Sequence, residues 1–119
     1  MPSPSQRKGY RVEQQAKRFL KRRGLSYLSQ HFHCRYGEID LIMKESDVIV
    51  FVEVRSRAHN QFANAIESIN VQKQQKIIKT MQIYLLTHQL PHLTDHRLDV
   101  VGKDGNDNFY WIRNALEVQ

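Results

Sequence analysis

Residues 37–55 read GEIDLIMKESDVIVFVEVR, and this stretch decides the fold. It contains two runs rich in β-branched and large apolar residues, separated by the polar break Glu45-Ser46-Asp47. Such runs on either side of a short turn are typical of two neighbouring antiparallel strands. In the second run Val48 to Val52 is apolar at every position, which indicates a central strand that is covered on both faces.

Two helices are predicted, one before and one after this stretch in the sequence. In the first, apolar residues recur at helical spacing over residues 9–23, and Gly24 stands where a left-handed C-cap belongs. The second is predicted to start within residues 64–70 and must stop before Pro91, because a proline ring cannot continue a helix.

The order of the elements predicts the fold class. Besides the two strands in the opening stretch, the same criteria indicate three more, over residues 25–34, 97–101 and 108–112. The order helix, three strands, helix, two strands is typical of an α/β fold with a mixed sheet flanked by helices. A chain of 119 residues fits one domain. We place it at residues 9–119, after a flexible N-terminal lead-in over residues 1–8.

Composition indicates where the protein works. No apolar run approaches the roughly 20 residues that a membrane span needs, and residues 1–8 lack the apolar stretch of a signal peptide. The single cysteine, Cys34, cannot form an internal disulfide, which agrees with a reducing compartment. We therefore expect a cytoplasmic protein with no membrane partner.

The charge is unevenly distributed. Residues 1–24 hold eight basic residues and one acid, Glu13, although the whole chain carries a formal net charge of only +6. A basic segment of this kind attracts polyanions, and nucleic acids are the commonest of them. Cations at residues 21–23 also suit the C-terminus of a helix. Charge alone therefore leaves open both nucleic-acid contact and a solvated helix end.

Two acids, Asp40 and Glu53, interrupt the apolar strands, where an ionised carboxylate is costly without a partner. Strand alternation places Glu53 and Arg55 on one face, whereas the strand register decides whether Asp40 joins them. Two carboxylates and a cation suit metal-dependent hydrolysis of phosphodiesters. The same residues, with Arg57 and Arg97, also fit an ion-pair network that does no chemistry. The spacing leaves both readings open.

The pattern Gly-Glu-Ile-Asp ending at Asp40, followed by Phe-Val-Glu-Val-Arg ending at Arg55, resembles the nuclease superfamily whose signature is an aspartate followed by Glu-x-Lys. Within it, the chain is most similar to the YraN family of predicted endonucleases, which is related to archaeal Holliday junction resolvases. Further matches are Glu13, Arg57, Lys73 and the segment Arg97-Leu98-Asp99-Val100-Val101. The resemblance implies a restriction-endonuclease-like three-layer fold.

The resemblance also implies a set of site residues. Asp40 and Glu53 would ligate Mg²⁺ or Mn²⁺, and Glu13 would reach the same site from the first helix. The lysine of the family is replaced by Arg55. Because arginine stays charged at any working pH, Arg55 would orient water or stabilise the phosphorus centre rather than act as a base. The implied catalytic set is therefore Glu13, Asp40, Glu53 and Arg55.

The implied partner is nucleic acid, in particular structured or branched DNA. We expect its contacts to come from five basic residues: Arg7, Lys8, Arg11, Arg57 and Lys73. Cutting both strands of a duplex requires two sites related by two-fold symmetry, which leaves a homodimer open. Two alternatives also stay open: a non-catalytic nucleic-acid-binding module of the same fold, and a protein-interaction subunit whose basic helix docks an acidic partner.

Three weaker signals complete the sequence reading. We expect Asp99 to pair with an arginine such as Arg97 rather than to ligate a metal. The run His31-x-His33-Cys34 is not expected to bind zinc, because no second ligand cluster follows it. Tyr10 and Tyr36 flank the proposed site, where an aromatic ring packs at a rim or stacks on an unpaired base.

Overall fold

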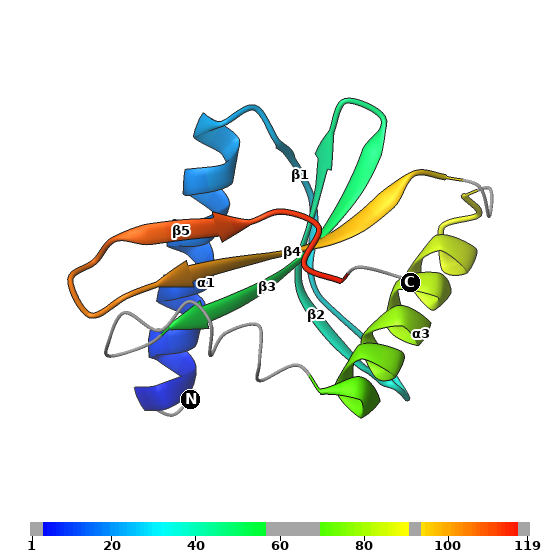
Figure 1. Cartoon of the computed structure of the whole chain (residues 1–119), viewed down its shortest axis with the longest axis horizontal. Helices are drawn as coiled ribbons and strands as arrows, with labels where there is room; N and C mark the ends of the chain where they lie inside the picture. Colours follow the sequence, from blue (N-terminus) through cyan, green and yellow to red (C-terminus); the bar gives the residue numbers. More distant parts are fainter. Residues whose placement is uncertain (1–3, 57–69, 91–93, 117–119) are drawn as a thin grey trace.

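The computed structural model describes residues 4–56, 70–90 and 94–116 (Figure 1). The predicted order of helix, three strands, helix and two strands is confirmed, and the strand boundaries agree with the predicted ones to within two residues. The elements are α1 (Pro4–Arg22), β1 (Ser26–Cys34), β2 (Gly37–Glu45), β3 (Val48–Ser56), α3 (Val71–Thr87), β4 (His96–Lys103) and β5 (Phe109–Ile112).

The strands form one five-stranded mixed sheet in the order β1-β2-β3-β4-β5. The first three strands pair antiparallel, so the predicted meander is confirmed. β4 lies parallel to β3, and β5 lies antiparallel to β4. A parallel neighbour requires a crossover connection, and α3 lies within it. The apolar strand β3 is therefore central, as its sequence predicts.

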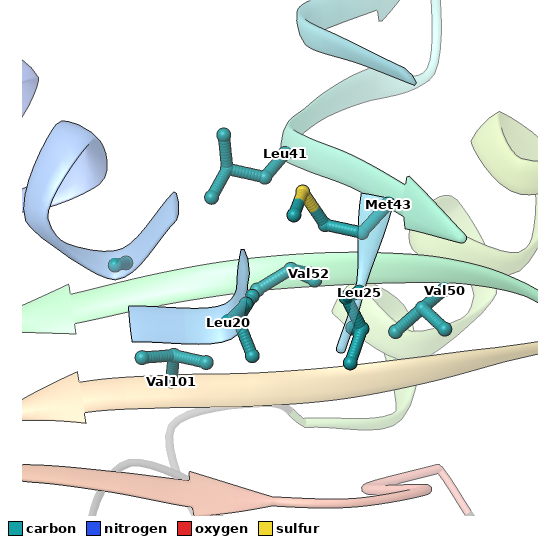
Figure 2. Packing of buried hydrophobic residues seen from close by; sticks show 8 residues of the cluster. Leu20, Leu25, Leu41, Met43, Val50, Val52 and Val101 are labelled. Carbon is teal, nitrogen blue, oxygen red and sulfur yellow. The ribbon is translucent and has the colours of Figure 1, made fainter. Parts of the chain in front are cut away.

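One face of the sheet packs against α1. Val50 and Val52 of β3 lie in a core with Ala16 and Leu20 of α1, and Figure 2 shows Leu20, Leu25, Val50 and Val52 gathered there. Leu20 is fully buried, and burying such a side chain contributes about 2 kcal/mol. The helix is thus fixed against the centre of the sheet.

The opposite face packs against α3. Ile49 and Phe51 of β3 lie in a second core with Met81, Tyr84 and Leu85 of that helix. Because successive side chains of a strand point to opposite faces, β3 contributes to both cores. The described residues therefore form three layers, with one helix on each face of the sheet.

The start of α1 differs from the prediction. The helix begins at Pro4, five residues before the predicted start, so residues 4–8 of the predicted lead-in belong to it. Proline suits the first position of a helix because its fixed φ is helical and its missing N–H would have no partner there. Pro4 therefore begins a helix rather than lying in a flexible lead-in.

The end of α1 follows the prediction. Gly24 adopts a left-handed φ of 97° and donates its N–H to Lys21 O at 3.1 Å. Leu25 N–H donates to Leu20 O at 3.2 Å, which completes a Schellman motif. Since Leu25 and Leu20 share one core, this cap also directs the chain into β1.

No helix in the described ranges combines the length and the apolar character that a membrane span requires.

Candidate functional site

The site lies where β2 and β3 separate. Their ladder ends at the pair Leu41 and Val52, so Asp40 and Glu53 are the next residues on the two strands. Oδ2 of Asp40 accepts a hydrogen bond from Val54 N–H at 2.8 Å. This hydrogen bond continues the pairing of β2 with β3 beyond the last ladder pair, and it therefore keeps Asp40 close to Glu53.

Arg55 connects these acids. Its Nη2 lies 3.2 Å from Oε2 of Glu53, and its Nη1 lies 3.8 Å from Oδ2 of Asp40. Nη1 also donates to Val54 O at 3.1 Å. The prediction that Glu53 and Arg55 share a face is confirmed, and the register, which the sequence left open, brings Asp40 to them.

Glu13 joins the strands through His31. Oε1 of Glu13 lies 3.3 Å from Nε2 of His31, whose Nδ1 lies 3.1 Å from Oε1 of Glu38. One imidazole thus links the first helix to β2, and Glu13 is positioned beside the strand acids.

The backbone of His31 is unusual for a strand. The β1–β2 register pairs Gln30 with Leu41 and Phe32 with Ile39, which leaves His31 opposite Asp40. His31 has a φ of 56°, a left-handed conformation that is uncommon outside glycine and that clusters at functional sites. This local irregularity directs the imidazole toward α1.

These residues lie around a cavity of about 370 Å³ that is open to solvent. Of the predicted catalytic set, Glu13, Asp40 and Arg55 line it, and buried Glu53 is paired with Arg55. The described residues that line it are Gly9, Tyr10, Glu13, His31, Glu38, Asp40, Val54 and Arg55. Three elements, α1, β2 and β3, therefore bring the predicted set to one place, and β1 adds His31.

The carboxylates of the site are held in an environment that disfavours their ionisation. Burial, followed by the charge of Asp40, raises the pKa of Glu53 to about 8, although Arg55 opposes the rise. Burial and Asp40 likewise raise the pKa of Glu13 to about 7. Burial also raises the pKa of Asp40, against the Val54 hydrogen bond and Arg55. Crowded acids of this kind favour an additional cation.

A divalent metal fits this donor set in one binding mode. Among the described residues, Oε1 of Glu53 is buried without a hydrogen-bond partner, so one hard oxygen is free. No group of three or more histidine, cysteine, aspartate or glutamate side chains in that part of the chain could hold a metal ion. Mg²⁺ commonly uses only one or two protein carboxylates and completes its shell with water and phosphate oxygens. Asp40 and Glu53 match that mode.

The described residues that were predicted to contact nucleic acid lie farther apart than the predicted catalytic set. Arg11 is exposed on α1, next to the cavity residue Tyr10. Lys73 is exposed in the first turn of α3 and does not line the cavity. The side chains of Arg7 and Lys8, and all of Arg57, lie outside the described residues.

Sequence reasoning missed His31 and Glu38 as site residues. Glu38 precedes Asp40 by two positions in β2, so strand alternation was a signal that could have identified it. His31 was considered only as a zinc ligand, and its left-handed backbone has no readable signal in the sequence.

Asp99 has the structural role that its sequence context predicts. Its carboxylate accepts hydrogen bonds from Arg97 Nε at 2.9 Å, Trp111 Nε1 at 2.9 Å and Asn114 N–H at 2.8 Å. Arg97 also contacts Glu45 at 3.0 Å. These residues form a network separate from the cavity lining, so Arg97 does not compensate Asp40 or Glu53.

Residues 12–102 match the sequence model of a family described as "Uncharacterised protein family UPF0102". The chain is 43% identical over 114 residues to a UPF0102 protein of Legionella pneumophila, covering 95% of this chain and 97% of that protein. It is 38% identical over 119 residues to one from Coxiella burnetii, covering 100% and 99%. A UPF0102 protein of Actinobacillus pleuropneumoniae is 43% identical over 110 residues, covering 91% and 89%. Glu13, Asp40, Glu53 and Arg55 all lie within the matched range.

Proposed function

The chain belongs to the UPF0102 family, as its similarity to YraN proteins predicts, and on this premise we propose that it binds nucleic acid and hydrolyses phosphodiester bonds in DNA with a divalent metal. The observation that carries this proposal is that Glu13, Asp40 and Arg55 line one cavity and that Arg55 pairs with the buried Glu53 behind it. The three-layer arrangement of the described residues is compatible with a restriction-endonuclease-like fold, which is the fold that we propose.

Asp40 and Glu53 would hold Mg²⁺ or Mn²⁺. Glu53 contributes the buried oxygen Oε1, which has no partner among the described residues. Asp40 is oriented by Val54 N–H. A bound metal of this kind polarises a phosphoryl oxygen and lowers the pKa of water.

The chain's own residues would then position the substrate and move protons. Arg55 presents a permanent positive charge at the cavity, where it stabilises charge on the phosphate but cannot accept a proton. Glu13 has a pKa of about 7, so its carboxylate can gain or lose a proton near neutral pH. We assign Arg55 to charge stabilisation and Glu13 to proton transfer.

The substrate class follows from charge and from the family resemblance. The cavity opens beside the first helix. Residues 1–24, which include that helix, carry eight of the 18 basic residues of the chain. Basic residues near a hydrolytic site attract the phosphate backbone without reading its sequence. Branched or structured DNA is the substrate that the resemblance favours.

The test is cleavage of labelled four-way junction, flap, duplex and single-stranded DNA with Mg²⁺ or Mn²⁺. Glu53→Gln removes one ligand charge and keeps the shape of the side chain. Asp47→Asn makes the same change in charge at an exposed turn and serves as the matched control. We expect cleavage by the wild type and by Asp47→Asn and its loss in Glu53→Gln. Absence of cleavage by the wild type on every substrate would overturn the hydrolytic function.

One observation favours a second function, a non-catalytic nucleic-acid-binding module. The Arg55 guanidinium lies 3.2 Å from Glu53 and 3.8 Å from Asp40, and it therefore compensates both acids in part without a metal. This function predicts salt-sensitive DNA binding without cleavage in the wild type. If Arg55→Lys cleaves DNA where the wild type does not, Arg55 is the residue that prevents cleavage.

A further inference from the structure

A second concave surface lies on the α3 side of the sheet, between the β1–β2 turn and the first half of α3. A cavity of about 390 Å³ is lined by Tyr36 of the turn and by Gln72, Gln75, Lys76 and Lys79 of the helix. Figure 1 shows this end of β2 beside α3. All the described residues that line this cavity have polar, cationic or aromatic side chains.

The aromatic ring of Tyr36 gathers two cations. Arg35 Cζ lies 4.9 Å from the ring centroid and Lys79 Nζ lies 5.0 Å from it. Contact with an aromatic face attracts a cation, so the ring holds two like charges near each other despite their repulsion. We call Arg35, Tyr36, Lys76 and Lys79 the turn–helix surface.

Among the described residues, the cations of this surface have no acidic partner. α3 contains three lysines and no acidic residue. Within the described residues, neither Arg35, Lys76 nor Lys79 forms an ion pair, whereas Arg55, Arg97 and Arg113 each pair with a carboxylate. Uncompensated positive charge that the fold does not use is available to an external anion.

The turn that carries this surface is fixed against α3 by buried contacts. Thr80 of α3 is fully buried, donates to Lys76 O at 2.8 Å and lies 3.7 Å from the Cys34 Sγ atom. Cys34 Sγ in turn accepts from Tyr36 N–H at 3.4 Å. A Cβ on Gly37 would lie 3.4 Å from the Thr80 hydroxyl, so the turn packs closely on the helix. Such preorganisation lowers the entropic cost of binding a ligand.

The surface is also close to the candidate active site. Glu38, which lines the first cavity, follows Tyr36 by two residues. Two residues span at most about 7 Å along the chain. Because α1 and α3 lie on opposite faces of the sheet, a nucleic-acid strand bound in the first cavity would reach the second by passing around the β1–β2 turn.

We propose that the turn–helix surface binds the phosphate backbone of the nucleic-acid strand that continues from the candidate active site. Arg35, Lys76 and Lys79 contact the phosphates, and Tyr36 is a positioning residue that holds two of these cations. Lysine acts on phosphate as a point charge, so the contacts carry affinity and not base specificity. The identity of the ligand as nucleic acid rests on the proposed function.

The experiment measures binding of a fluorescent single-stranded DNA by anisotropy at several salt concentrations. Every protein carries Glu53→Gln, so that cleavage does not interfere. Lys79→Ala is compared with Lys44→Ala, which removes the same charge from an exposed lysine of β2. We expect Lys79→Ala to weaken binding about five- to tenfold and to lower the salt slope by about one, as loss of one phosphate contact does. Lys44→Ala should change neither.

A second variant separates positioning from contact. Tyr36→Leu keeps every cation but removes the ring, so we expect weaker binding with an unchanged salt slope, and circular dichroism confirms that it folds. Equal affinity of Lys79→Ala and Lys44→Ala would overturn the turn–helix surface and leave the proposed function standing. If the Glu53→Gln protein does not bind the DNA even at low salt, the proposal that the ligand is nucleic acid fails instead.

Discussion

Nη2 of Arg55 lies 3.2 Å from Oε2 of Glu53, and the Glu53 side chain is only 8% exposed. The two residues are neighbours on one face of β3, which places a permanent cation against a buried acid whose pKa is raised by burial to about 8. The ion pair therefore compensates only part of the cost of burying the Glu53 charge.

Removal of Arg55 should destabilise the protein in a pH-dependent way. In Arg55→Ala, Glu53 loses the cation that opposes the rise of its pKa. Below about pH 6 the carboxyl is protonated and needs no partner, so the loss of stability is small. Near pH 9 the variant either ionises Glu53 without compensation or keeps a proton that the unfolded chain releases, and in both cases we expect a loss of about 1 to 3 kcal/mol. Urea unfolding at both pH values, with Arg55→Ala/Glu53→Gln as the control, measures the difference. An equal loss at both pH values in Arg55→Ala would contradict it.

The metal-free protein should lose stability as the pH rises. The pKa of Glu13 is raised to about 7 and that of Glu53 to about 8, both from 4.5, so the folded protein holds these protons more tightly than the unfolded chain. Their contribution is complete below about pH 4.5 and is lost as the pH rises through 7 to 8.

Glu53→Gln isolates this effect because glutamine does not titrate. With a chelator present, we expect the variant to match the wild type near pH 4 and to exceed it by about 2 kcal/mol or more near pH 9. The measurement is the free energy of unfolding across this range. A constant difference between the two proteins would show that Glu53 does not titrate as described.

The sequence predicted those parts of the fold that local patterns determine. The apolar run of β3 indicated a central strand, and the left-handed C-cap at Gly24 formed as predicted because a left-handed residue there requires little beyond glycine itself. The start of α1 at Pro4 was missed because proline marks both helix starts and irregular chain ends.

The candidate site was predictable only in part. The strand motif placed Glu53 with Arg55, but Asp40 and Glu13 join them only through the register and through the packing of α1. The bridging role of His31 depends on its left-handed backbone, and the proximity of Arg35 to Lys79 joins residues 44 positions apart. Such long-range contacts leave no periodic signal in one sequence.

Asp99→Asn should destabilise the protein without altering the candidate site. The fully buried carboxylate accepts from Arg97, Trp111 and Asn114, and an amide cannot accept from all three donors. We expect a loss of about 2 kcal/mol in urea unfolding at pH 7, because buried donors are left unpaired. Glu45→Gln alters a more exposed acceptor of the same Arg97 and should cost less than about 1 kcal/mol. Equal losses in the two variants would contradict the structural role of Asp99.

Divalent metal should stabilise the wild type through Asp40 and Glu53 and should release protons as it binds. At pH 7.5 a carboxyl with a pKa of about 8 is largely protonated, and a metal ligand must be deprotonated, so binding expels a proton. With Mg²⁺ at ten times its dissociation constant the gain is about 1.4 kcal/mol, which raises the Tm by a few degrees. Calorimetric titration in two buffers that differ in ionisation enthalpy measures the protons released.

We expect both effects in the wild type and in Asp47→Asn, and neither in Glu53→Gln. An equal rise in Tm for Glu53→Gln, without proton release in the wild type, would mean that Mg²⁺ binds elsewhere and that Glu53 is not its ligand.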